Sequence, residues 1–236
     1  MSVDRPLICM PTYNESENLE AIVEAIHDEV PDVHLLVIDD DSPDGTGELA
    51  DEMAADDERI HVLHRTEKAG LGPAYIAGFE WALDRDYDAI LEMDADFSHQ
   101  PKYLPDMIGA LEEADVVIGS RYVPGGGTED WGPIRKLISQ GGGWYARTIL
   151  GFDVRDPTAG FVAWRREVLE TIDLEDVEAS GYVFQIEMKY RAWCEDFELT
   201  EIPITFPDRK AGESKMSADI ALEAVTRVWS IRAKVG

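Results

Sequence analysis

Residues 89–101, Ala-Ile-Leu-Glu-Met-Asp-Ala-Asp-Phe-Ser-His-Gln-Pro, contain an apolar run that ends in two acids, Asp94 and Asp96. Residues i and i+2 of a strand point to the same face, so a strand that continues to its end here directs both carboxylates into one pocket. Two hard oxygen ligands this close suit Mg²⁺ or Mn²⁺, and such metals commonly also hold substrate phosphates. The alternative is a solvated turn after the strand, because the pattern is short and the chain is rich in Asp.

Apolar segments alternate with helical patterns around this stretch. Short apolar runs predict strands, and three-to-four-residue periodicity between them predicts helices. Continuous apolar runs are typical of strands buried on both faces, so we expect an α/β fold with a Rossmann-like, mostly parallel sheet flanked by helices. The expected strands are residues 7–10, 34–38, 60–63, 89–93 and 116–119, and the expected helices are residues 17–30, 72–83 and 101–113.

Ligands of such sheets bind beyond the carboxyl ends of the strands. Polar residues follow four of the expected strands at this position: residues 12–15, residues 39–41, the Asp94–Asp96 pair and Arg121. Agreement among four separate segments is stronger evidence than any one of them. The sequence therefore predicts one ligand site at this edge of the sheet.

The second half of the chain is less regular. We expect a glycine-containing mobile loop over residues 122–133, and an edge strand over residues 200–206 because it contains Pro203. A polar loop follows at residues 208–214. Neither a repeat nor a linker is visible, so residues 1–236 are expected to form one domain. Helices are expected at residues 135–150, 183–193 and 216–233.

The charge is large and uneven. The chain has 21 basic and 49 acidic residues, for a net charge of −28. Residues 1–120 hold only 6 of the basic residues, and residues 121–236 hold the other 15. An anionic ligand of the second half is the simplest reason for keeping cations there, and the overall negative field argues against nucleic acid. Acids on most of the expected helices also suggest a halophilic protein, since salt screens their repulsion.

Targeting signals and cysteine chemistry are not evident. The sequence has no N-terminal apolar segment typical of a signal peptide and no run of 18 apolar residues, so we expect a cytoplasmic protein without a membrane span. Its two cysteines, Cys9 and Cys194, lie in an apolar run and a helical pattern. We expect both to be small core residues.

In their order and spacing, these segments resemble family-2 glycosyltransferases of the GT-A fold, and most closely the polyprenyl-phosphate (dolichyl-phosphate) mannosyl- or glucosyltransferases. The resemblance covers nearly the whole chain. It implies that residues 1–120 bind a nucleotide sugar and that residues 121–236 bind the acceptor and end in an amphipathic helix. The matching segments are Pro11–Glu15, Asp39–Thr46, Gly70–Gly72, Asp94–His99, Gly119–Tyr122 and Arg209–Lys215.

The implied reaction is an inverting, Mg²⁺- or Mn²⁺-dependent transfer of mannose or glucose from GDP-mannose or UDP-glucose to a polyprenyl (dolichyl) monophosphate. A polyprenyl acceptor implies a peripheral position at the cytoplasmic face of the membrane, or a small membrane partner subunit. The C-terminal helix, with apolar residues beside Arg227, Arg232 and Lys234, either packs on the core or lies at the membrane interface.

The resemblance also assigns residues to the two substrates. For the nucleotide sugar they are Pro11, Tyr13, Glu15, Asp39, Asp40, Asp94 and Asp96, and one of the acids at residues 39–41 is expected to be only a turn cap. For the metal they are Asp94, Asp96 and Ser98, although Ser98 also suits a helix cap. For the acceptor phosphate they are Arg121, Arg135 and Arg209, with Lys210 and Lys215 as weaker candidates, and Asp96, Arg121, Arg135 and Arg209 form the expected catalytic set.

Two alternatives remain open at this point. A family-2 enzyme that glycosylates a sugar hydroxyl would need a general base. A nucleotide-sugar-binding subunit without catalysis would need neither the intact Asp94–Asp96 pair nor the retained cations.

The charge leads to a prediction about salt. We expect the melting temperature and the free energy of unfolding to rise with KCl concentration, because screening weakens repulsion among the acids. A calorimetric melting series in KCl measures this, with a sucrose series as the uncharged control. Full stability at low salt would rule out the halophilic adaptation.

Overall fold

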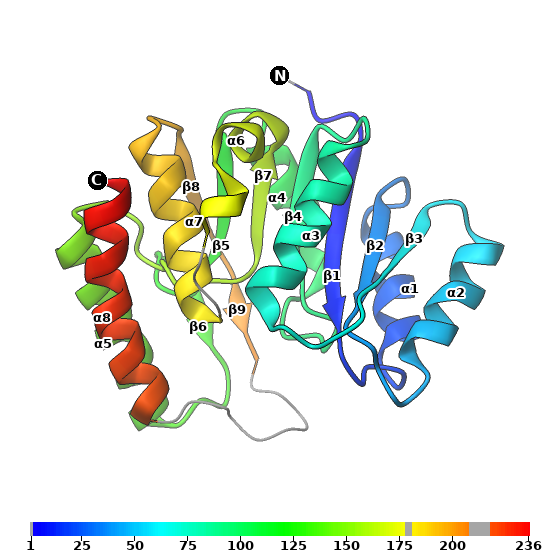
Figure 1. Cartoon of the computed structure of the whole chain (residues 1–236), viewed down its shortest axis with the longest axis horizontal. Coiled ribbons are helices and arrows are strands. Elements are labelled where there is room, and N and C mark those ends of the chain that lie inside the picture. Colours follow the sequence, from blue (N-terminus) through cyan, green and yellow to red (C-terminus); the bar gives the residue numbers. More distant parts are fainter. Residues whose placement is uncertain (1, 178–180, 208–217) are drawn as a thin grey trace.

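The computed structural model describes residues 2–177, 181–207 and 218–236, and Figure 1 shows its arrangement. Its main sheet has seven strands in the order β3-β2-β1-β4-β7-β5-β8. Every pairing in it is parallel except those of β7, which is antiparallel to both β4 and β5. The strands are β1 (Pro6–Thr12), β2 (His34–Asp39), β3 (Ile60–His64), β4 (Ala89–Glu92), β5 (Val116–Ser120), β7 (Val162–Arg165) and β8 (Leu199–Pro203).

Helices cover both faces of this sheet, so the molecule has three layers (Figure 1). Helices α3 and α7 lie in front of the sheet in this view, and α5 packs beside α8 at one end. The helices are α1 (Leu19–Glu29), α2 (Thr46–Asp56), α3 (Leu71–Leu83), α4 (Leu104–Ala110), α5 (Pro133–Leu150), α6 (Arg166–Thr171), α7 (Tyr182–Cys194) and α8 (Ala218–Val235), with single 3₁₀ turns η1 (Pro101–Tyr103) and η2 (Leu174–Asp176).

The core has two parts because successive side chains of a strand point to opposite faces. Leu7 and Cys9 of β1 belong to the part that contains residues of α3 and α7. Ile8 and Met10 belong to the part that contains residues of α1 and α4. The predicted α/β class with a mostly parallel sheet and flanking helices is confirmed.

Three details differ from the expected elements. β7 was not predicted, and it inserts between β4 and β5. The helix expected over residues 101–113 is split into η1 and α4, because Pro105 has no backbone N–H to continue one helix from Pro101. The loop expected over residues 122–133 contains β6 (Gly127–Thr128), which pairs with β9 (Thr205–Phe206) in a second, two-stranded sheet.

The C-terminal parts of the chain mostly follow the expectation. β8 lies at the edge of the main sheet and carries Pro203 at its end. Val228 and Ile231 of α8 are buried in the core, whereas Trp229 is exposed. Within the described ranges, no helix is both long and apolar enough to cross a membrane. The polar loop expected at residues 208–214 lies outside the described residues.

The close approach of Gly126 to Ser120, the last residue of β5, leads to a prediction about stability. A Cβ atom on Gly126 would lie 2.5 Å from the backbone oxygen of Ser120, whereas one on Gly127 would meet nothing within 4 Å. We expect Gly126→Ala to lower the free energy of unfolding by about 1–3 kcal/mol, because the backbone at Ser120 must shift. Gly127→Ala is the matched control and should change it by less than about 0.5 kcal/mol. Equal effects in denaturant titrations would contradict the close contact.

Candidate functional site

β4 ends at Glu92, one residue earlier than expected, and Asp94 and Asp96 follow it, with Asp96 in a bend. Both are partly exposed, and Ala95 between them is buried. Because the strand does not continue to the pair, strand alternation does not place the two carboxylates on one face, and that expectation stays a prediction. Phe97 has a φ of 61°, so the chain turns immediately after the pair.

His99 fixes the start of this turn. Its Nδ1 accepts a hydrogen bond of 2.9 Å from the backbone N–H of Asp94, and its ring stacks on Phe161 with centroids 4.9 Å apart. A ring nitrogen that accepts carries no proton, so neutral His99 holds its proton on Nε2. This geometry makes His99 a support of the Asp94 backbone.

The residues of this turn fit a hard divalent cation. Two carboxylates project from it, and the buried Ser98 Oγ has no hydrogen-bond partner among the described residues. The Ser98 backbone N–H donates to Asp96 Oδ1 over 2.9 Å, which orients that carboxylate. Within residues 2–177, 181–207 and 218–236, no group of three or more His, Cys, Asp or Glu side chains could hold a metal. Hard divalent cations often take some of their ligands from water or substrate oxygens, which suits a site with few carboxylates.

The loop after β1 carries the residues expected to bind the nucleotide. The Tyr13 side chain is exposed, and Lys68 Nζ lies 3.3 Å from the centroid of its ring. Asn18 donates a hydrogen bond of 2.9 Å to Glu15 Oε2, and the backbone N–H of Glu15 donates to Thr46 Oγ1. These contacts fix the position of Glu15.

Asp39 and Asp40 have different roles. Asp39 accepts hydrogen bonds from the Thr12 hydroxyl and from the backbone N–H and hydroxyl of Ser42, so it orders the loop. Asp40 pairs with Arg65 Nη1 at 2.5 Å. Burial raises the pKa of the Asp40 carboxyl, and the Arg65 charge opposes this shift. Asp39 is thus the turn cap expected among the three acids.

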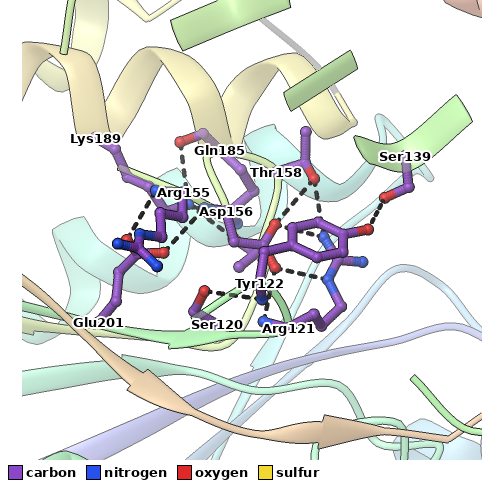
Figure 2. Close-up of polar contacts among 11 residues, drawn as sticks. Ser120, Arg121, Tyr122, Ser139, Arg155, Asp156, Thr158, Gln185, Lys189 and Glu201 are labelled. Carbon is purple, nitrogen blue, oxygen red and sulfur yellow. Dashed lines mark hydrogen bonds and ion pairs between the residues drawn. The ribbon is translucent and has the colours of Figure 1, made fainter. Parts of the chain in front are cut away.

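Arg121, at the end of β5, is held by a buried acid (Figure 2). Its Nε donates to Asp156 Oδ2 over 2.7 Å and its Nη2 donates to Asp156 Oδ1 over 2.6 Å. Nη2 also donates to Thr158 Oγ1, and the Arg121 backbone N–H donates to Asp156 Oδ2. Asp156 is fully buried, so this two-point ion pair fixes the plane of the guanidinium.

A second arginine, Arg135, lies near Arg121 because both contact the ring of Trp131. The Arg135 guanidinium carbon lies 3.9 Å from the Trp131 ring centroid, and that of Arg121 lies 5.5 Å from the same centroid. Phe206 contributes another ring 5.6 Å from Arg121. Two of the expected acceptor cations therefore meet around Trp131. The other three, Arg209, Lys210 and Lys215, lie outside the described residues.

Several residues near the site were not found from the sequence. Arg65 directly follows β3, so it could have been found by searching for polar residues at the carboxyl ends of the strands. Glu201 of β8 accepts hydrogen bonds from the backbone N–H groups of Arg155 and Asp156, as Figure 2 shows. Asp156 itself follows no predicted strand and gave no periodic signal.

A second buried charge pair lies below the Asp94–Asp96 turn. Glu92 and Lys189 are both completely buried. Burial raises the pKa of Glu92 and lowers the pKa of Lys189, and the attraction between the two groups opposes both shifts. Gln185 connects them by hydrogen bonds to each.

Residues 7–173 match the family model for glycosyl transferase family 2. The chain belongs to that family and is a glycosyltransferase.

Curated relatives narrow the group within the family. The chain is 52% identical over 235 residues to the polyprenol monophosphomannose synthase of Mycolicibacterium smegmatis, covering 98% of this chain and 89% of that protein. It is 50% identical over 232 residues to the undecaprenyl-phosphate mannosyltransferase of Micrococcus luteus, covering 98% and 96%. It is 37% identical over 229 residues to the dolichol-phosphate mannosyltransferase of Pyrococcus furiosus, covering 95% and 62%. The resemblance seen in the sequence is confirmed.

Solved structures with low sequence identity share the GT-A fold. Glucosyl-3-phosphoglycerate synthase from Mycobacterium tuberculosis, solved with Mn²⁺, UDP and glucosyl-3-phosphoglycerate, has a TM-score of 0.68 at 20% identity, covering 98% of this chain and 81% of that one. A mannosyltransferase from Pyrobaculum calidifontis, solved with GDP-mannose and Mn²⁺, has a TM-score of 0.59 at 14% identity, covering 100% and 76%.

The hydrogen bonds of Asp39 lead to a stability prediction. We expect Asp39→Asn to lower the free energy of unfolding by about 1–3 kcal/mol, because the amide cannot accept all three bonds and leaves buried partners unsatisfied. The exposed Asp41 is the matched control, and Asp41→Asn should change it by less than about 0.5 kcal/mol. Urea titrations of the two variants would contradict the assignment if Asp39→Asn were neutral.

Proposed function

We propose that this glycosyltransferase moves mannose from GDP-mannose to a polyprenyl monophosphate, with inversion at the anomeric carbon and with a divalent metal. The observation that carries the proposal is the pair of partly exposed acids, Asp94 and Asp96, at the same sheet edge as the anchored Arg121. The names of the three curated relatives support mannose and a lipid phosphate. UDP-glucose remains the alternative donor.

The loops after β1 and β2 are proposed to hold the nucleotide. Tyr13 offers an exposed ring on which a base can stack, worth about 1–3 kcal/mol in other systems. Glu15 and Asp40 offer carboxylates that can accept hydrogen bonds from the base or ribose, with Pro11 beside them. Asp39 supports this site indirectly, through the loop that it orders.

The metal site is proposed to consist of Asp94 and Asp96, with Ser98 Oγ as a further oxygen. A bound Mg²⁺ or Mn²⁺ would neutralise the negative charge that develops on the departing diphosphate. The carboxylates therefore hold the donor diphosphate through the cation. The Mn²⁺-containing complexes of the two solved GT-A relatives are consistent with such a site.

The acceptor phosphate is proposed to lie near Arg121 and Arg135. A phosphate monoester is already anionic near neutral pH, since its second pKa is near 6. One of its oxygens can attack C1 directly as the bond from C1 to the diphosphate breaks, so an α-linked donor becomes a β-linked product without a general base. The enzyme's task is then to align the two phosphates. Three further cations of residues 208–217 are proposed to help bind the acceptor phosphate: Arg209, Lys210 and Lys215.

The lipid chain of the acceptor is proposed to reach the site along α5. Ile134 and Leu137 of this helix are 73% and 71% exposed, and Ile138 and Trp144 are also exposed. These positions fall on one helical face, and Arg135 begins the same helix. An apolar face on the helix that carries Arg135 suits contact with a membrane surface, and we propose that the exposed Trp229 of α8 takes part in it.

The two alternative functions fit the site less well. A sugar-hydroxyl acceptor needs a general base, whereas the buried acids Asp156 and Glu92 are already hydrogen-bonded within the protein. A non-catalytic binding subunit would have no need for an arginine fixed in plane by Asp156.

Asp96→Ala tests the function and the metal together. Wild-type protein should transfer label from GDP-mannose to dolichyl phosphate in detergent, high KCl and Mn²⁺, and EDTA should stop it. Asp96→Ala should lose at least about 10²-fold in rate, because the diphosphate is no longer held. Label in the organic phase is counted, with UDP-glucose run in parallel. Near-normal turnover of Asp96→Ala would refute the metal assignment.

Arg135→Ala tests the acceptor site. The KM for dolichyl phosphate should rise about tenfold, which corresponds to the loss of one charge-assisted hydrogen bond. The KM for GDP-mannose should stay unchanged. Arg147→Ala, on the same helix and paired with Asp153, is the control and should change neither constant. Equal effects of the two variants would remove Arg135 from the site.

A further inference from the structure

Four side chains form a buried polar cluster behind the turn that carries Asp94 and Asp96. Glu92 ends β4, Trp164 lies on β7, and Gln185 and Lys189 lie on α7. None of the four is more than 2% exposed. The reaction proposed above uses none of them directly.

Hydrogen bonds connect the cluster in a line. Trp164 Nε1 donates to Glu92 Oε1 over 2.8 Å, and Gln185 Nε2 donates to Glu92 Oε2. Lys189 Nζ donates to Gln185 Oε1 over 3.0 Å and to the Gln185 backbone oxygen over 3.1 Å. The amide of Gln185 thus joins a buried acid to a buried base.

The line continues toward the arginine site. Lys189 Nζ also donates to the backbone oxygen of Ala159 over 2.7 Å. Ala159 follows Asp156 and Thr158, the two residues that hold the Arg121 guanidinium, and Figure 2 shows Lys189 and Gln185 in the same region as this ion pair. Glu92, at one end of the cluster, therefore lies two residues before Asp94. Lys189, at the other end, binds the segment whose residues Asp156 and Thr158 hold Arg121.

Stability alone does not explain this arrangement. Burying a charged pair costs desolvation energy, and well-packed apolar residues of similar volume often stabilise a protein as much or more. A fully bonded buried polar network does, however, fix one geometry. We propose that Glu92, Gln185 and Lys189 are positioning residues that set the spacing between the Asp94–Asp96 turn and Arg121.

The proposal rests on the proposed function, in which those two elements hold the donor diphosphate and the acceptor phosphate. In-line attack requires the two phosphates at one separation, and a misplacement of about 1 Å can cost about 10²-fold in rate. The cluster would therefore affect turnover and metal affinity without touching either substrate.

The test removes both charges together. Glu92→Gln and Lys189→Met each leave one buried charge uncompensated and should lower the melting temperature. The double variant Glu92→Gln/Lys189→Met should recover that loss. Its kcat for transfer from GDP-mannose to dolichyl phosphate should nevertheless stay about 10- to 100-fold below wild type, and more Mn²⁺ should be needed for half-saturation.

A matched control exists on the same helix. Glu187 and Arg191 of α7 form an ion pair at 2.8 Å that also contacts the backbone oxygen of Asp176, on the far side from Glu92 and Ala159. Glu187→Gln/Arg191→Met removes the same charges and should leave kcat and the Mn²⁺ midpoint within about twofold of wild type.

All variants are assayed well below the melting temperature of the least stable variant. Each is then folded during the assay, whether or not the double variant regains stability. A Glu92→Gln/Lys189→Met variant with wild-type kcat and Mn²⁺ midpoint would overturn the positioning role. So would equal losses in the Glu187–Arg191 control, which would indicate general damage to α7. Absence of Mn²⁺-dependent transfer in the wild type would instead contradict the proposed function.

Discussion

The buried ion pair between Arg121 and Asp156 is the contact on which the second half of the site depends. It ties the end of β5 to the segment that leads into β7, and Thr158, Glu201 and Lys189 support it from three directions. Because Asp156 is fully buried, the pair must satisfy both partners at once. The two-point pair therefore holds the Arg121 guanidinium in one orientation just beyond β5.

The same pair limits how much positive charge reaches the pocket. Asp156 offsets the charge of Arg121, so at the proposed acceptor site several cations together would attract the phosphate. Arg135, stacked on Trp131, is the second of these within the described residues. On a protein with a net charge of −28, such a local group of cations gives the ligand a narrow region of favourable potential.

The sequence allowed the sheet edge that carries the candidate site to be predicted, because each expected group follows a strand of a mostly parallel sheet. Asp40, Asp94 and Arg121 all lie at the expected edge for that reason. β7, Asp156 and the Glu92–Gln185–Lys189 cluster could not be predicted in this way. β7 is a short antiparallel strand, and the partners of Asp156 and Glu92 lie 35 and 93 residues away along the chain. Local periodicity contains no information about such pairings.

β7 also has a consequence for the order of assembly. β3, β2, β1 and β4 pair with one another using only the first 92 residues, whereas β5 has no neighbour in the sheet until β7 and β8 exist. During synthesis from the N-terminus, the loops after β1 and β2 can therefore form early, whereas the surroundings of Arg121 are complete only after residue 165. Such long-range pairing slows folding, and it leaves the edge of β4 exposed on the nascent chain until β7 arrives.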